Sequence, residues 1–373
     1  MRGVLARLGI AALFLAGCSS SSGPKPAPLP ELANPRPVQL LWSASVGGAE
    51  RFIFYPALSG DAVYASSRDG AVLRLDAATG KEVWRISLGT PLSAGAGAGS
   101  GTVAFATEEG EVIALDAADG KERWRGRVSS EVLAAPTVGS GLVLVRSVDN
   151  RVFAFGELDG KRRWVYQRSP TSLMVRSPAG VTIDGETAFL GVPGGRLVAL
   201  ALGNGGVRWE ATVAIPKGAT ELERVTDVVG YPAVQGREVC VAAYQGRVAC
   251  FEAATGRQLW ARDLSVLNGV SLDARYAYVS DEKGAVHALD RSNGRAIWKQ
   301  DRLSLRQLSL PLPVGATAAV GDFEGYVHFL ARDSGAFVSR YSTGGGAVRA
   351  APLPLPKGFL VQTADGGLYA LAP

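Results

Sequence analysis

A 15-residue segment, residues 70–84, recurs along most of this chain at a period near 40 residues. Its sequence is Gly-Ala-Val-Leu-Arg-Leu-Asp-Ala-Ala-Thr-Gly-Lys-Glu-Val-Trp, in which two apolar stretches flank a turn that contains glycine. That pattern predicts two antiparallel strands in each copy, and a preceding Asp-Gly turn adds another. One such small sheet cannot bury both of its faces. A tandem array therefore predicts a β-propeller, in which every blade packs against two neighbours.

The tryptophan that ends the segment allows the number of blades to be counted. Six copies carry it, and a seventh copy begins at Gly325 with Ser339 in its place. An eighth copy begins at Gly366 and lacks the strand that bears the tryptophan. Near the other end, residues 40–47 around Trp42 resemble an isolated strand of that kind. We therefore predict an all-β, eight-bladed propeller whose ring closes when the N-terminal strand joins the last blade. The six tryptophans are Trp84, Trp124, Trp164, Trp209, Trp260 and Trp298.

Composition agrees with this class and excludes others. The chain has 373 residues, of which 47 are glycine and 47% are hydrophobic, as expected for many strands and tight turns. Radial repetition allows residues 38–373 to form one domain without an oversized core. The net charge of +5 is small and scattered, so nucleic acid is not an expected partner.

The N-terminus has the features of a bacterial lipoprotein. Residues 1–17 combine a positive start with an apolar run too short to span a bilayer, which predicts a signal peptide. They end in Leu-Ala-Gly before Cys18, which resembles the lipobox, so Cys18 is the predicted lipid attachment point; the alternative is an ordinary secretory signal with an incidental cysteine. Ser19, where aspartate would favour the inner membrane, favours the outer membrane. Residues 18–37 are rich in serine and proline and predict a tether reaching roughly 50 Å.

Catalytic signals are weak. His287 and His328 occupy the same position in two repeats, which favours a framework role over metal or acid/base chemistry. The aspartates before the repeat turns have a sufficient explanation as acceptors for turn N–H groups. A glycine-rich stretch, residues 95–101, lacks the helix and the Lys-Ser/Thr pair of a phosphate loop, so a small-residue strand near the propeller axis is expected. We predict no catalytic residue, metal or cofactor.

Cys240 and Cys250 lie on two strands joined by a turn at residues 245–246. They are expected to be cross-strand neighbours. An oxidising periplasm would favour a disulfide that closes a short loop. Two free buried thiols are the alternative, because cross-strand geometry often strains such a bridge.

The repeats also carry a family resemblance. Residues 114–124, Ala-Leu-Asp-Ala-Ala-Asp-Gly-Lys-Glu-Arg-Trp, resemble the pyrroloquinoline-quinone-type propeller repeat. With the lipobox and eight repeats, the chain from Cys18 onward resembles the BamB family of outer-membrane assembly lipoproteins. Three stretches support this beyond the repeat, namely residues 218–227, 243–246 and 320–326.

The resemblance implies a non-enzymatic scaffold that is lipid-anchored at the periplasmic face of the outer membrane. It implies binding to the POTRA domains of BamA, association with the other lipoproteins of the barrel assembly complex, and contact with unfolded outer-membrane proteins. The alternatives are a quinone-dependent periplasmic dehydrogenase or a scaffold of another envelope complex. Such dehydrogenases use an adjacent Cys-Cys pair and acidic calcium ligands, which this sequence does not match.

Two insertions, residues 166–178 and 211–232, are expected on one face of the ring, where binding loops are commonly placed. By the resemblance, Leu173, Val175 and Arg176 would contact BamA, with Asp227 as an acidic contact. Val229 departs from the family pattern, which has aspartate there. The alternative for Asp227 is structural, a pairing with Arg176 or Arg224 that holds the loops together.

Overall fold

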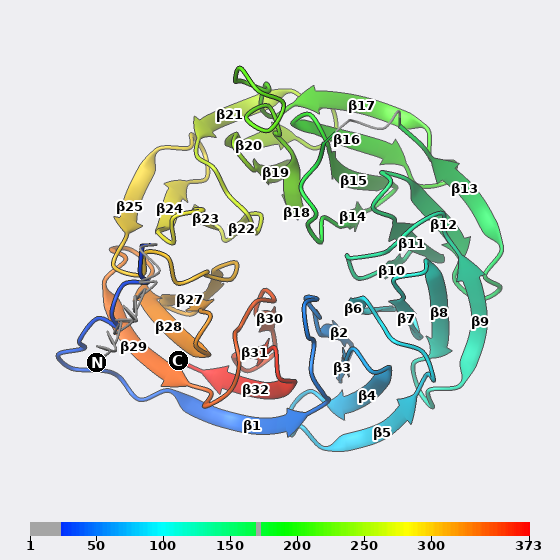
Figure 1. Cartoon of the computed structure of the whole chain (residues 1–373), viewed down its shortest axis with the longest axis horizontal. Helices are drawn as coiled ribbons and strands as arrows, with labels where there is room; N and C mark the ends of the chain where they lie inside the picture. The colour runs from blue at the N-terminus through cyan, green and yellow to red at the C-terminus, as the bar shows by residue number, and fades with distance from the viewer. Residues whose placement is uncertain (1–23, 169–172) are drawn as a thin grey trace, which may run out of the picture.

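The computed structural model describes residues 24–168 and 173–373, and within them every regular element is a β-strand. The strands form eight four-stranded antiparallel sheets arranged as blades around a central axis (Figure 1). Seven blades are meanders of four consecutive strands, and the eighth combines three C-terminal strands with β1. The prediction of an eight-bladed propeller closed by the N-terminal strand is confirmed.

In each blade the first strand named is nearest the axis. Blades 1 to 4 contain β2 (Ala57–Ser59), β3 (Ala62–Ser66), β4 (Ala71–Asp76) and β5 (Glu82–Ser87); β6 (Ala94–Gly99), β7 (Thr102–Ala106), β8 (Glu111–Asp116) and β9 (Glu122–Arg127); β10 (Thr137–Gly139), β11 (Leu142–Arg146), β12 (Val152–Gly156) and β13 (Arg162–Tyr166); β14 (Val181–Asp184), β15 (Thr187–Val192), β16 (Arg196–Ala201) and β17 (Val207–Thr212).

Blades 5 to 8 contain β18 (Val228–Gln235), β19 (Glu238–Ala243), β20 (Arg247–Glu252) and β21 (Gln258–Asp263); β22 (Ser271–Leu272), β23 (Tyr276–Ser280), β24 (Val286–Asp290) and β25 (Ala296–Gln300); β26 (Leu312–Val314), β27 (Thr317–Gly321), β28 (Tyr326–Ala331) and β29 (Phe337–Ser342); β30 (Leu353–Pro354), β31 (Phe359–Gln362), β32 (Gly367–Ala372) and β1 (Gln39–Ser45).

The burial of each strand follows from its place in the blade. The second strands β3, β7, β23, β27 and β31 are buried along their whole length, and β11, β15 and β19 are buried except at one or both ends, because the neighbouring blades cover both faces of the sheet. The outer strand β5 alternates between exposed and partly buried residues, since only one of its faces packs inward. The hydrophobic cores accordingly lie between blades and run around the ring.

Each tryptophan of the repeat clasps the next blade. Its indole N–H donates to a backbone carbonyl there, and its ring lies on the glycine of the turn between that blade's two outer strands. A Cβ atom on Gly80 would lie 2.6 Å from the ring of Trp42, so only glycine fits under the indole. The seven donor and acceptor pairs are Trp42 and Ala77, Trp84 and Ala117, Trp124 and Glu157, Trp164 and Leu202, Trp209 and Ala253, Trp260 and Arg291, and Trp298 and Arg332.

Close approach to the axis explains the glycine-rich strand β6. A Cβ atom on Gly95 would lie 2.2 Å from the backbone nitrogen of Tyr55, and one on Gly97 would lie 1.8 Å from the carbonyl oxygen of Pro136. Both neighbours belong to the segments that lead into the inner strands of the adjacent blades. The glycines therefore allow three blades to approach backbone to backbone.

Residues 24–36, which we call the strap, run along blade 7 before the chain enters β1 (Figure 1, blue). The N–H of Ala27 donates to the carbonyl oxygen of Ser304 at 2.9 Å, and that of Arg36 donates to Val338 in β29 at 3.2 Å. The predicted signal peptide, residues 1–17, and the predicted lipidation site, Cys18, lie outside the described residues. In the described part of the chain, no helix has the length and apolar character needed to cross a membrane.

Candidate functional site

One face of the ring, which we call the loop face, carries the connections from each outer strand to the next blade, together with the turns between second and third strands. Both sequence insertions emerge there, as expected, between β13 and β14 and between β17 and β18. The second insertion is shorter than the sequence suggested. Its last five residues, 228–232, belong to β18, whose pairing with β19 is interrupted by a bulge between Val229 and Ala233.

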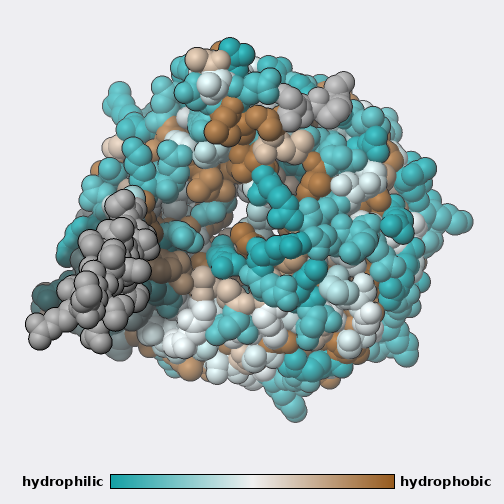
Figure 2. All heavy atoms as spheres, in the orientation of Figure 1, coloured by the Kyte–Doolittle hydropathy of each residue, from teal (hydrophilic) through white to brown (hydrophobic). Residues whose placement is uncertain are grey.

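A hollow of about 240 Å³ opens on the loop face over blades 3 and 4. Its walls come from the β9–β10 and β13–β14 connections, from the β11–β12 turn, and from the start of β18. Apolar side chains gather beside it, around the β17–β18 connection (Figure 2). Ile215 and Leu222 of that connection are 68% and 72% exposed, so they add two large apolar side chains to the exposed surface beside the hollow.

Asp227 lies at the floor of this hollow and is 6% exposed. One carboxylate oxygen accepts the N–H of Val175 at 2.6 Å, and the other accepts that of Gly194 at 3.2 Å. Burial raises the pKa of Asp227 above its ordinary value, against the opposing effect of the two N–H donors and of the Arg146 charge. The carboxylate thus fixes the β13–β14 connection through its backbone.

The remaining predicted contact residues lie on that connection, where Val175 and Arg176 line the hollow. Leu173 is 47% exposed, Val175 is partly buried, and the Arg176 side chain is 53% exposed. Arg176 pairs with Glu131 of the β9–β10 connection. Arg224 instead donates to the carbonyl oxygen of Gly218 at 2.9 Å. Neither arginine is the partner of Asp227, so the pairing considered as its structural alternative is not found. Asp227 holds the connection through backbone N–H groups instead.

Arg146 was missed by sequence reasoning. It ends β11 and contributes a guanidinium to the wall of the hollow, where it donates to the carbonyl oxygen of Ala179 and to the side chain of Asn150, each at 3.3 Å. Burial lowers its pKa to about 10, although the neighbouring Asp227 carboxylate acts in the opposite direction. The equivalent residues of the other second strands are uncharged, so an arginine at this position was the available signal. They are Ser66, Ala106, Gly191, Ala242, Ser280, Gly321 and Gln362.

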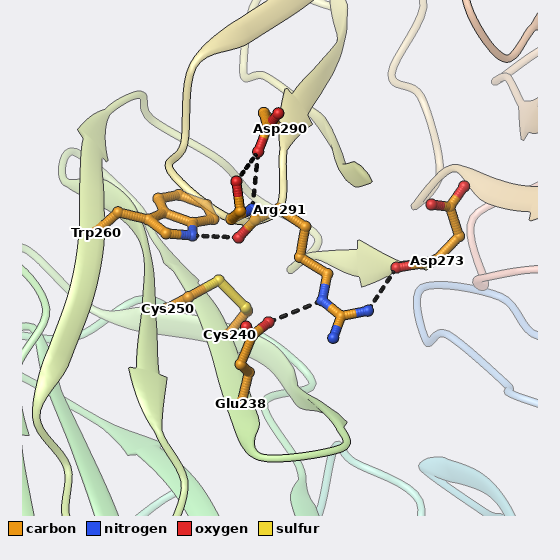
Figure 3. Close-up of a disulfide and its surroundings, with 8 residues drawn as sticks. Glu238, Cys240, Cys250, Trp260, Asp273, Asp290 and Arg291 are labelled. Atoms are coloured by element: carbon orange, nitrogen blue, oxygen red, sulfur yellow. Dashed lines mark hydrogen bonds and ion pairs between the residues drawn. A yellow bond between two sulfur atoms is a disulfide. The ribbon is translucent and has the colours of Figure 1, made fainter. Parts of the chain in front are cut away.

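Cys240 and Cys250 face each other across β19 and β20 and are joined by a disulfide (Figure 3). Both are fully buried. Nearby, the guanidinium of Arg291 donates to Glu238 at 2.8 Å and to the carbonyl oxygen of Asp273 at 2.9 Å. The bridge joins two neighbouring strands within blade 5, and Arg291 links blade 6 to Glu238 of blade 5. Neither lines the hollow.

The two histidines lie in the third strands of blades 6 and 7, β24 and β28, and each contacts an aspartate in the turn before its strand. His287 contacts Asp281 at 2.8 Å, and His328 contacts Asp322 at 2.9 Å, each through Nε2. The equal spacing of six residues between aspartate and histidine was a signal that the sequence already contained. Among residues 24–168 and 173–373, no three His, Cys, Asp or Glu side chains are grouped so as to hold a metal ion.

Comparison with known proteins places this geometry in a family. Residues 68–300 match the family described as outer membrane protein assembly factor BamB. The protein of that name from Bordetella pertussis is 44% identical, with 98% of this chain and 96% of the relative covered. The crystal structure of BamB from Moraxella catarrhalis superposes with a TM-score of 0.83 at 26% identity, covering 90% of this chain and all of that one.

A quinohemoprotein alcohol dehydrogenase from Pseudomonas putida shares the fold, with a TM-score of 0.71 over 90% of this chain and 76% of the enzyme. Its sequence identity is only 14%, so this likeness concerns the propeller alone. The family match and the relatives above 40% identity, by contrast, extend through the insertions that build the hollow. The chain belongs to the BamB family of outer membrane protein assembly factors.

Proposed function

We propose that this protein is a non-enzymatic scaffold of the outer-membrane β-barrel assembly complex, anchored by lipid on Cys18 at the periplasmic face of the outer membrane. Its partner would be the POTRA domains of BamA, next to the other lipoproteins of the complex and to unfolded outer-membrane proteins. The observation that carries the proposal is the β13–β14 connection, which the buried Asp227 holds in place with Leu173 and Arg176 exposed.

The chemistry of this surface suits a protein partner. Leu173 and Val175 supply apolar contact area. The guanidinium of Arg176, now paired with Glu131, can leave it and bind a carboxylate of the partner. Asp227 acts indirectly, because its oxygens are already taken by backbone N–H groups. We therefore assign Leu173, Val175 and Arg176 to contact and Asp227 to positioning.

The test is capture of BamA by the detergent-solubilised lipoprotein. Arg176→Ala, and Leu173→Ala combined with Val175→Ala, should each weaken capture while leaving the thermal melt nearly unchanged. Arg295→Ala is a matched control, since Arg295 is exposed in a turn on the opposite face. Full capture by both loop variants would move the interface elsewhere. A quinone chromophore that remained bound to the purified protein would instead favour the dehydrogenase alternative.

A further inference from the structure

Two arginines, Arg306 and Arg340, hold the strap, and other contacts of their side chains with blade 7 fix their positions. The Arg306 side chain is 3% exposed, donates to the fully buried Asp322 at 2.7 Å, and also pairs with Glu324. The Nε–H of Arg340 donates to Nδ1 of the buried His328 at 3.3 Å. Both guanidinium groups are therefore oriented by residues of the blade, with further N–H groups left to donate elsewhere.

Those N–H groups reach two carbonyls of the strap. Arg306 donates to the carbonyl oxygen of Ala27 at 3.0 Å, and Arg340 donates to that of Pro30 at 2.6 Å. Prolines at positions 24, 26, 28 and 30 favour the polyproline II conformation, in which residues three apart point to the same side. The carbonyls of Ala27 and Pro30 therefore point to the same side of the strap, where Arg306 and Arg340 can both donate to them. Because the prolines already stiffen the segment, it loses little conformational entropy when it docks.

The docked segment leads onto the loop face. Pro24 and Pro26 line a second hollow with Leu305 and Leu308 of the β25–β26 connection and with Arg349 of the β29–β30 connection. Cys18 precedes Pro24 by six residues, a length of chain that spans about 20 Å when fully extended. The reach available to the anchor is then much shorter than that of a free tether of residues 18–37.

We propose that the strap fixes the orientation of the propeller, so that the loop face at blades 6 and 7 is turned toward the membrane surface at which the N-terminus is anchored. This inference rests on the lipid anchor of the proposed function. It adds that the β13–β14 connection, which lies on the same face across the ring, is presented close to the bilayer and not at the end of a long flexible tether.

Energy transfer to acceptor-labelled lipids tests the orientation. The mature lipoprotein in nanodiscs would carry one fluorophore at Lys283→Cys or at Lys81→Cys, two exposed positions on the loop face and the opposite face, respectively. We expect clearly greater transfer from position 283. Equal transfer from both positions, or greater transfer from position 81, would overturn the proposal.

Releasing the strap should abolish the difference between the two positions. Ala27→Pro removes the N–H that donates to Ser304 and changes no residue of the propeller, and Arg340→Ala removes the donor to Pro30. Either variant should bring the two transfer values together, whereas Arg295→Ala should leave them apart. A difference that survives in both strap variants would show that something other than the strap sets the orientation.

Hydrogen exchange separates the strap from the anchor and from partner binding. In the lipoprotein, the amides of Ala27 and Arg36 should exchange about tenfold more slowly than in a synthetic peptide of residues 24–36, as expected for ordinary hydrogen bonds. Exchange at the peptide rate would contradict docking, even in a protein that captures BamA. Slow exchange in a protein that mass spectrometry shows to be unacylated would refute the anchor and the membrane orientation, but not the docking.

Discussion

The indole N–H of Trp42 donates to the carbonyl oxygen of Ala77 at 3.0 Å, across the boundary between blade 8 and blade 1. The two residues are 35 positions apart in the sequence. Their hydrogen bond, at the point where the ring closes, is the same tryptophan contact that is found between other blades. The same boundary contains a core in which Trp42 and Leu360 pack against Val63 and Leu73. Closure therefore uses the same contacts as the rest of the propeller.

Gly80→Ala should destabilise the protein more than Gly60→Ala. Both glycines have positive φ, at 70° and 60°, so both substitutions place alanine in a left-handed conformation that costs about 1–2 kcal/mol. Only position 80 lies under the Trp42 ring, since nothing is within 4 Å of a Cβ atom at position 60. Overpacking should add about 1–3 kcal/mol to the loss at position 80. Urea unfolding gives the comparison, and equal losses would mean that the clasp has room for a methyl group.

Deleting residues 40–46 should lower the midpoint of thermal unfolding sharply. The deletion removes the outer strand of blade 8 and the clasp of Trp42, and it exposes the edge of β32. Calorimetry of the deletion variant beside the full-length protein measures the effect. An unchanged midpoint would refute ring closure by β1.

Asp227→Ala should loosen the β13–β14 connection. It leaves the N–H groups of Val175 and Gly194 without their acceptor, which costs about 1–3 kcal/mol for an unsatisfied buried donor. Faster hydrogen exchange at Val175, together with weaker capture of BamA, is the expected result. Asp227→Asn retains one carbonyl oxygen and should give a smaller effect. Normal exchange at Val175 in the alanine variant would show that the loop does not depend on this carboxylate.

Glu131→Gln should strengthen capture of BamA. Arg176 must leave Glu131 to bind a carboxylate on a partner. An ion pair at the surface contributes roughly 0.2–1 kcal/mol, or about 1.4- to 5-fold in affinity, and here the Arg176 side chain is half exposed while that of Glu131 is mostly buried. A titration of the immobilised POTRA domains measures the change. Weaker binding by this variant would indicate that Glu131 itself contacts the partner.

Stability should fall as the pH drops below about 6.5, because of His328. Burial lowers the pKa of His328, with Arg340 and Arg306 acting in the same direction and Asp322 opposing them. As the pH falls, the histidine of the unfolded chain therefore binds a proton before His328 of the folded protein does. The stability that comes from neutral His328 is fully present above about pH 6.5 and is lost progressively below it. Asp322 has a lowered pKa and titrates below its ordinary value of 3.8, so it does not account for a loss between pH 6.5 and 4.

Urea unfolding across that pH range measures the effect. His328 is surrounded by Asp322, Arg340 and Arg306, and the ring of Tyr326 lies beside it on the same strand. His328→Gln keeps a neutral donor and acceptor in place and should flatten the pH dependence. An identical slope in the variant would assign the titration to another group.

Periodic features of the molecule could be predicted from the sequence, because they are repeated contacts. The Trp42 strand and the eight blades depend on local strand patterns and on one clasp used many times. The roles of Asp227 and Arg176 could not be predicted, because their partners are the N–H of Val175 and the carboxylate of Glu131, on connections with no repeating pattern. Docking of the strap depends on Arg306 and Arg340, which lie about 300 residues away in sequence.

Ser339 replaces tryptophan at the boundary between blades 7 and 8. Blade 8 has no hairpin between β32 and β1 on which an indole could rest, so within the described chain this is the boundary without a clasp. The strap crosses that boundary. It precedes β1 of blade 8 and is bound to blade 7, where Arg36 donates to Val338 and Pro30 accepts from Arg340. A mechanical pull on the N-terminus would load the strap contacts on blade 7 before it reached β1. Force applied through the proposed lipid anchor would thus act first on blade 7, before it could pull the closing strand β1 off the ring.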